Sequence, residues 1–306
     1  MLRYPENEWM PATAIARGRP AEGSGPPLIV TVYLDPPTAR VLDTSVFRTS
    51  LFGFLHRFHE NLTIPQYSGR AIVGWVGVAM LILSLSGIYL WWPRNGKFLP
   101  GLRWWRSAHV DNNLHHLLGF WISLPLAFVS LTGIYLSFPP QARELMSAVA
   151  PMTPPAPRVG FGPVARQTTL TPERALAAAQ AAVPQARPET LFLPVAAREG
   201  AANSSLSWRI RLSAPDTETV TVTVDDNTGN ATVAPAPFSG DRAALWIRRL
   251  HEGSHSGVIW RIIVLLTGIF PTVLGVTGII VWLRRRRLRR RIAVQSGPRE
   301  ILRAAE

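Results

Sequence analysis

The chain has 306 residues, of which 47% are hydrophobic, and it carries a formal net charge of +13 and no cysteine. The lack of cysteine excludes disulfides, thiolate catalysis, cysteine-ligated iron–sulfur clusters and covalently attached c-type haem. A basic chain can bind nucleic acid, but here the positive charge lies beside apolar segments, so we expect no nucleic acid partner.

The first 70 residues predict a small module followed by an amphipathic segment. Residues 1–27 are rich in proline, glycine and charge, and they are expected to be loosely ordered. LIVTVYLDPPTARVLD (28–43) is typical of two strands joined by a turn, which makes 1–44 a partial outward module. The segment 45–70 begins with an amphipathic helical pattern that Pro65 is expected to end.

Three long apolar runs predict membrane spans at 71–92, 117–138 and 262–283, none of which contains a charged residue. A helix rises about 1.5 Å per residue, so each run can cross a hydrocarbon core about 30 Å thick. A buried helix of a soluble protein is the alternative, but three uncharged runs of this length disfavour it. The fold class is therefore an α-helical integral membrane bundle.

The charge of the connecting segments predicts the topology. Segment 93–116 has four basic residues and one acidic residue, and the tail 284–306 has nine arginines and two acids. Segments 1–70 and 139–261 are nearly balanced, with seven basic against six acidic residues and twelve against ten. By the positive-inside rule, 93–116 and the tail are expected to be cytoplasmic, and the tail could also contact anionic membrane lipid.

This topology places Met1 outside, although MLRYPENEWMPATAIARG lacks the apolar core of a signal peptide. We therefore expect that a first transmembrane helix is absent from this sequence. A chain with that helix would have four spans.

The long outward segment after the second span has three expected parts. Residues 139–163 contain many prolines and predict a linker, 164–237 a small α+β domain, and 238–261 a second amphipathic segment. Within the domain, LTPERALAAAQAAV (170–183) predicts a helix capped by Thr171.

Alternating valine and threonine in ETVTVTVDDNTGNATV (218–233) predicts two strands joined by a tight turn, and LSWRIRLSA (206–214) predicts another strand. The domain is thus expected to place one helix on a small antiparallel sheet.

The span ends contain a repeated motif, SLSGIYL at 84–90, SLTGIYL at 130–136 and GVTGIIV at 275–281. Small residues let transmembrane helices approach closely, and we interpret the repeat as helix packing.

All seven histidines lie in three clusters at membrane boundaries, and none lies in the expected α+β domain. The clusters are His56 with His59, His109 with His115 and His116, and His251 with His255. A lone histidine at such a boundary is usually an interfacial polar group, but three clusters indicate a site.

The spacing of the outward histidines suggests a shared ligand. His56 and His59 are three residues apart and His251 and His255 four, so each pair is expected to share a helix face. If the two helices face each other, one histidine from each can hold one metal, as in haem b bound in a helical bundle. Arginines near these helices could pair with haem propionates: Arg57, Arg70, Arg248, Arg249 and Arg261.

On the inward side, LHHLLGFW (114–121) places Gly119 four residues after His115. A flat macrocycle needs a small residue where it lies against a helix, so His115 is a candidate ligand for a second haem. His109 and His116 are the local alternatives.

HEGSH (251–255) also matches the H-E-x-x-H signature of zinc metalloproteases. Catalytic zinc needs a third protein ligand, and the next acidic residue after Glu252 is Glu300, beyond the third span, so Glu60 or His59 would have to supply it. Gly253 and Ser254 are also poor helix formers, so we regard a zinc site as the less favoured alternative.

Several of these segments together resemble one family. They are FLHRFHENL, SGRAIVGW, NNLHHLLGFW, the domain at 170–233, RRLHEGSHSG and TGIIVWLRR. Over about residues 28 to 285 the chain resembles the PepSY-associated transmembrane proteins, also described as iron-regulated inner-membrane proteins. Some members are di-haem ferric-siderophore reductases.

The resemblance implies four spans, of which the first would carry an inward histidine that this sequence lacks. It implies that His59 and His251 ligate an outer haem, and that His115 ligates an inner haem with a histidine of the missing helix. The implied function is electron transfer from an unknown cytoplasmic donor to a periplasmic ferric siderophore. A PepSY-type binding or inhibitory module without redox activity is the alternative.

Overall fold

The computed structural model describes residues 1–5, 7, 9–18, 28–92, 107–154, 165, 167–195, 206–213 and 219–303. The chain forms two compact units. The first joins Met1–Phe58 to Thr153–Phe238, and the second joins His59–Met152 to Ser239–Glu306. Most of the predicted loop 93–116 and the end of the predicted linker 139–163 lie outside the described residues.

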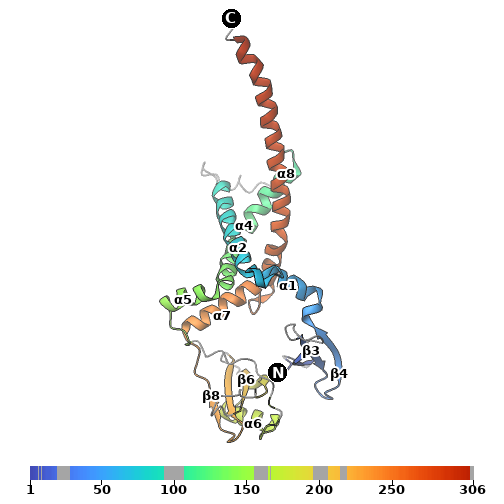
Figure 1. Ribbon diagram of the computed structural model, residues 1–306, viewed down its shortest axis with the longest axis vertical. Helices are drawn as coiled ribbons and strands as arrows, with labels where there is room; N and C mark the ends of the chain where they lie inside the picture. The colour runs from blue at the N-terminus through green and yellow to red at the C-terminus, as the bar shows by residue number, and fades with distance from the viewer. Residues whose placement is uncertain are drawn as a thin grey trace. The chain divides into compact units, whose positions relative to one another are not determined.

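The first unit contains one antiparallel sheet of eight strands (Figure 1). In the order of the sheet they are β4 (Val41–Val46), β3 (Leu28–Leu34), β2 (Ala12–Gly18), β1 (Leu2–Arg3), β5 (Arg187–Phe192), β6 (Ser207–Ser213), β7 (Val220–Asp225) and β8 (Ala231–Val233).

The sheet joins two parts of the sequence that we predicted to be separate. β1 pairs with β2 on one side and with β5 on the other, where Leu2 lies opposite Leu191. The expected module 1–44 and the expected domain 164–237 are therefore one sheet. The prediction of a loosely ordered 1–27 is wrong for β1 and β2, because backbone pairing with distant strands overrides the local composition.

The predicted hairpin at 28–43 is confirmed as β3 and β4, and the predicted strands at 206–214 and 218–233 are confirmed as β6, β7 and β8. Helix α6 (Pro172–Ala182) begins as expected, since the Thr171 hydroxyl accepts a hydrogen bond from the Arg174 N–H. Strand β5 was not predicted.

α6 covers β5 to β8, and the core lies between them. Alternate residues of the strands point into this core. Its buried side chains are Ala175, Ala179, Ala186, Leu191, Trp208, Ile210, Leu212, Val222 and Val224.

One charged side chain is buried beside this core. Asp226 is 1% exposed and accepts hydrogen bonds from the Thr169 N–H (2.7 Å), the Leu170 N–H (3.1 Å) and the Trp208 indole (2.8 Å). Burial by itself raises the pKa of the Asp226 carboxyl, but these hydrogen bonds outweigh it, and the net shift is downward. The carboxylate thus ties the segment before α6 to the turn after β7.

The second unit is helical. Its elements are the end of α1 (Leu51–Asn61), α2 (Gly69–Trp91), α4 (Val110–Ser137), α5 (Pro139–Val149), α7 (Ser239–Glu252) and α8 (Gly257–Arg303). The short 3-10 helix η1 (Phe47–Thr49) precedes α1 in the first unit, and η2 (Pro65–Tyr67) follows α1, where Pro65 was expected to end the helix.

Three of these helices are long and apolar enough to cross a membrane, namely Gly69–Trp91, Val110–Ser137 and Gly257–Arg291. They confirm the three predicted spans, except that Trp92 and Phe138, the last residues of the first two, lie one residue beyond the helix ends. α4 packs against both α2 and α8, so it is the central helix of the bundle (Figure 1). The start of the predicted linker is wrong, because Pro139 and Pro140 occupy the first turn of α5, where proline needs no partner for its nitrogen.

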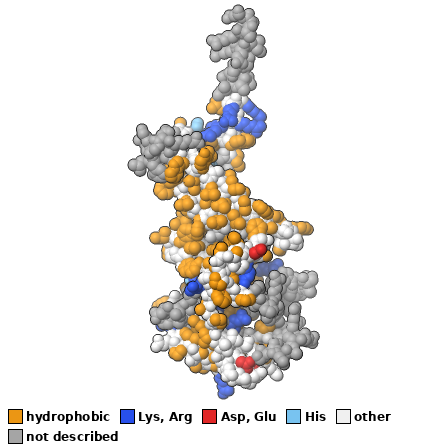
Figure 2. Space-filling model, turned by 90° about the vertical axis from the view of Figure 1, so that its left-hand side faces the viewer, with side chains coloured by type: hydrophobic (Ala, Val, Ile, Leu, Met, Phe, Trp, Pro, Cys, Tyr) orange, Lys and Arg blue, Asp and Glu red, His pale blue; other side chains and the backbone are white. Residues whose placement is uncertain are grey.

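The outer surface of the bundle is apolar. Side chains such as Trp75, Leu124 and Leu265 are more than 60% exposed, and Figure 2 shows hydrophobic side chains covering the helices. Arginines from Arg284 onward follow on α8. Such a surface suits lipid as its solvent, with the arginines at the headgroup level.

We predict that Asp226→Asn weakens the sheet unit by about 2 kcal/mol, because an amide cannot accept all three hydrogen bonds of the buried carboxylate. Thermal unfolding of the purified full chain measures this, with the exposed Asp43→Asn as control. Because the pKa of Asp226 is lowered in the folded state, its stabilisation is present above the carboxyl's unfolded pKa and is lost as pH falls through the folded pKa. The acid-dependent loss should be absent from Asp226→Asn.

Candidate functional site

Helix α7 ends inside the HEGSH segment, so residues 251–255 do not form one continuous helix. α7 ends at Glu252, Gly253 has φ +71°, and the Ser254 N–H donates to the Arg249 carbonyl (2.9 Å). This is a Schellman C-cap, and glycine is needed for its left-handed residue. His255 follows with φ +57°, so His251 and His255 do not share a helix face, and that prediction is wrong.

Two histidines from different helices converge in this unit. His59 lies near the end of α1 and His251 in the last turn of α7. Their ring centres are 6.1 Å apart and the ring planes differ by 25°. The predicted meeting of one outward histidine from each amphipathic segment is therefore present in the geometry.

The His251 ring is oriented by α4. Its Nδ1 lies 3.0 Å from the Thr132 hydroxyl and 3.1 Å from the Val129 carbonyl. A Cβ at Gly133 would lie 2.9 Å from the ring, so only glycine allows this approach. Burial, and next the neighbouring His59, lower the pKa of His251, which keeps the ring neutral and able to bind a metal at pH 7.

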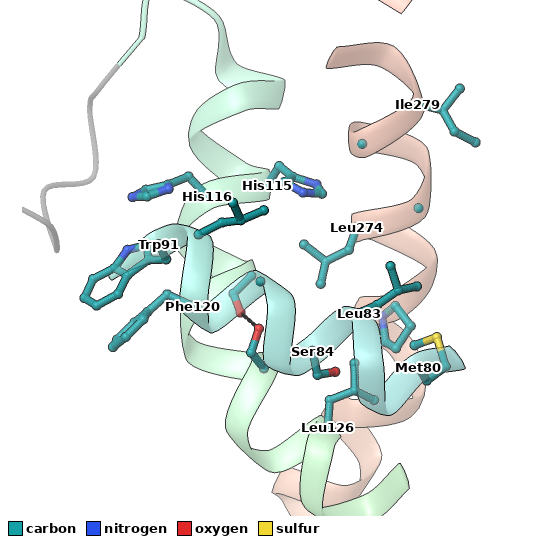
Figure 3. Close-up of a pocket in the computed structure, with 17 residues that line it drawn as sticks. Met80, Leu83, Ser84, Trp91, His115, His116, Phe120, Leu126, Leu274 and Ile279 are labelled. Carbon is teal, nitrogen blue, oxygen red and sulfur yellow. Dashed lines mark hydrogen bonds between the residues drawn. The ribbon is translucent and has the colours of Figure 1, made fainter. Parts of the chain in front are cut away.

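His115 on α4 is oriented in the same way by α8. Its Nδ1 lies 3.1 Å from the Thr277 hydroxyl, and a Cβ at Gly278 would lie 3.1 Å from the ring. The ring points toward α8 (Figure 3). His115 was predicted as a haem ligand, but its contact with α8 was not predicted.

The His115 side chain lines a cavity of about 680 Å³ between α2, α4 and α8 (Figure 3). Pockets of roughly 300–1,000 Å³ hold cofactors and other small molecules. Most of the lining is apolar, and glycines lie on all three helices: Gly87, Gly119, Gly275 and Gly278. The lining residue Ser84 is 5% exposed, and its hydroxyl has no hydrogen-bond partner among the described residues.

The other predicted site residues have different surroundings. The His56 ring packs edge-on against Phe47, and the His116 ring lies 6.4 Å from the Trp91 ring at the cavity. His255 and Arg261 are exposed. The Arg70 guanidinium donates to the Leu136 carbonyl (3.1 Å) at the end of α4 and pairs with Glu60 (3.6 Å), so it caps α4.

The residues present fit haem better than a closed zinc site. Two imidazoles on one iron have ring centres about 6 Å apart, since each metal–nitrogen bond is about 2 Å and each nitrogen lies about 1.1 Å from its ring centre. The separation of His59 and His251 agrees with this. Within the described ranges, no three His, Asp or Glu side chains gather around one point.

The residues that orient the histidines were not predicted. The carboxylates next to the histidines do not do this: Glu60 pairs with Arg70 (3.6 Å) and Glu252 with Arg248 (3.7 Å). The repeated motif contained the signal, because Thr132-Gly133 and Thr277-Gly278 are its second and third copies. We had interpreted these residues as helix packing only.

Comparison with known families agrees with this architecture. The PepSY-associated TM region family matches residues 3–285. The chain belongs to this family. A comparison with curated proteins found no match. Membership and the three candidate spans together show a membrane protein of the PepSY-associated type, as the resemblance implied.

We predict that Ser84→Ala stabilises the purified protein by about 1 kcal/mol, because it removes a buried hydroxyl without a partner. Ser123→Ala is the matched control on the same cavity, since the Ser123 hydroxyl donates to the Gly119 carbonyl and its loss brings no gain. The measurement is thermal unfolding in detergent. A lower unfolding temperature for Ser84→Ala would show that the hydroxyl binds a group in the purified protein.

Proposed function

We propose that the chain is a haem b protein of the bacterial inner membrane that passes electrons outward to a periplasmic ferric chelate, such as a siderophore complex. The observation that carries the proposal is the convergence of His59 and His251 with ring centres 6.1 Å apart. Bound haem would supply one-electron redox chemistry at this point. Membership of the PepSY-associated TM family is compatible with the proposal, and the resemblance of the motifs to di-haem ferric-siderophore reductases suggests it.

In this proposal the chain's own residues bind and orient the group. His59 and His251 would hold the group on the outward side, and the Thr132 hydroxyl and Val129 carbonyl fix the orientation of His251. His115 is the ligand on the inward side, at the apolar cavity between α2, α4 and α8. Arg70 and Arg261 remain candidates for propionates on the outward side.

The two candidate positions suit transfer across the membrane. Seventeen residues of α4 separate His115 from Thr132, the residue that contacts His251, which corresponds to about 25 Å along a helix. This is most of the hydrocarbon thickness. The inward position would receive electrons from a cytoplasmic donor, and the outward position would face the acceptor.

A ferric chelate fits as the acceptor on chemical grounds. Ferric iron is a hard cation that prefers oxygen ligands, and accepting one electron converts it to ferrous iron, which hard oxygen ligands hold less tightly. The protein would thus release iron without cutting the chelator. Iron release from a ferric siderophore by reduced protein measures this step directly.

The zinc protease alternative requires His251 and His255 on one helix face. The geometry does not meet this requirement, because α7 ends at Glu252 and His255 lies beyond the cap. A binding module without redox activity keeps one observation in its favour, the separate core of the sheet unit. It predicts a colourless protein whose function is lost with 164–237 and survives replacement of the histidines.

We predict that His251→Ala and His59→Ala each abolish one b-type haem signal in the reduced-minus-oxidised absorption spectrum of the purified protein. His255→Ala is the matched control, because this histidine lies outside α7. Equal haem content in His251→Ala and wild type would contradict the proposal. Zinc and haem should be quantified in the same samples, since zinc without haem would favour the protease.

We predict that the basic loop and tail are cytoplasmic, because arginine excess marks the cytoplasmic side. The chain has no cysteine, so single cysteines can report its topology. Thr63→Cys should react with an impermeant maleimide once the outer membrane is opened, and Ala108→Cys only after the inner membrane is broken. The reverse pattern would overturn the orientation.

A further inference from the structure

The tripeptide Thr-Gly-Ile is present in two copies that contact a histidine and one that does not. The copies at 132–134 and 277–279 contact His251 and His115 through both threonine and glycine. At the copy 267–269 on α8, no atom of the described residues outside the helix's own backbone lies within 4 Å of a Cβ placed on Gly268. The same tripeptide therefore has two kinds of surroundings: two copies contact an imidazole, and in the third copy no imidazole of the described residues lies against the glycine.

The contacts of His251 Nδ1 with α4 determine which nitrogen of the ring carries the proton. The Val129 carbonyl lies 3.1 Å from Nδ1, and a carbonyl can only accept, so Nδ1 is the donor. The Thr132 hydroxyl lies 2.9 Å from the Val129 carbonyl and 3.1 Å from the Phe128 carbonyl. By donating its one proton to either carbonyl, the hydroxyl is able to accept from the same Nδ1–H.

The same count applies to His115. The Thr277 hydroxyl lies 2.8 Å from the Val273 carbonyl and 3.3 Å from the Leu274 carbonyl, one of which receives its proton. With the hydroxyl donating to the nearer Val273 carbonyl, the 3.1 Å contact has His115 Nδ1 as its donor; the opposite direction would need the hydroxyl proton to leave that carbonyl. In a neutral ring with the proton on Nδ1, Nε2 has a free lone pair and can bind a metal.

The glycine of each copy sets the ring position. A Cβ at Gly133 would lie 2.9 Å from the His251 Cε1 atom, and one at Gly278 would lie 3.1 Å from the His115 Cε1 atom. Any side chain there would displace the imidazole. The protonated nitrogen is set by Thr132 together with the Val129 carbonyl for His251, and by Thr277 for His115, and the glycine sets the depth of each ring.

We propose that Thr132-Gly133 and Thr277-Gly278 are positioning dipeptides, each of which holds one histidine from another helix or segment as the Nδ1–H tautomer with Nε2 presented as a metal ligand. This rests on the proposed function for the identity of the metal, haem iron, but not for the tautomer. The repeated motif is then a ligand-orienting device as well as a packing motif. Thr267-Gly268 is the matched internal control. The Thr267 hydroxyl donates to the Val264 carbonyl (2.7 Å), and no imidazole of the described residues lies against Gly268.

The test has a part that needs no haem. Protein labelled with ¹⁵N-histidine is purified without haem in lipid nanodiscs at pH 8, where the nitrogen chemical shifts report which ring nitrogen carries the proton. We expect two Nδ1–H rings, assigned by their loss in His251→Ala and His115→Ala. Thr277→Val should return His115 to a mixture of tautomers, whereas Thr132→Val should change His251 less, because the Val129 carbonyl still accepts its proton. Thr267→Val should leave both rings unchanged.

The second part measures haem at the outward position. Gly133→Ala should weaken haem binding about 10-fold or more, by displacing His251 from its ligand position, and Gly268→Ala should not. Nε2–H rings in the wild type, or equal effects of Thr277→Val and Thr267→Val on His115, would overturn the positioning role. A wild type with Nδ1–H rings and no haem binding would instead support the dipeptides and contradict the proposed haem function.

Discussion

The imidazole of His251 rests on α4 through one nitrogen, and the geometry of the outward position depends on that contact. In an apolar surrounding a polar group without a partner is costly, so the threonine hydroxyl, the helix carbonyl and the ring satisfy one another. The bond connects α7, which carries His251, to the central helix of the bundle. Because His59 approaches the same ring from α1, the orientation of His251 sets the space between the two imidazoles.

The end of α7 is part of the same arrangement. Gly253 and the backbone bond from Ser254 to Arg249 stop the helix one residue after His251, and the Trp260 indole donates to the Leu250 carbonyl (2.8 Å). At the C-terminal end of α4, the Arg70 guanidinium donates to the Leu136 carbonyl and so caps that helix. Helix ends leave carbonyls unpaired, and both contacts satisfy them close to the histidines. The five residues that resemble a protease signature thus contain a helix cap next to the candidate ligand His251.

The eight-stranded sheet shows where local patterns stop being informative. The hairpin at 28–43 and the helix after Thr171 follow from alternation and capping, which depend on near neighbours and were predicted. β1 has two residues, and its pairing with β2 and β5 depends on residues far away in sequence. No local pattern could have shown that the N-terminal segment and the segment after the second span form one sheet.

The sequence alone determined the three spans, the basic segments beside them and the histidine clusters at their ends, because length, charge and hydrophobicity are properties of continuous segments. It also identified His59, His251 and His115 as candidates by their residue type and place. Only the tertiary structure decided that His59 meets His251 and that His255 does not share the helix face of His251. It also decided that Thr132 and Thr277 contact the two rings. Those facts depend on how helices pack, and side chains brought together by packing leave no spacing in the sequence from which they could be read.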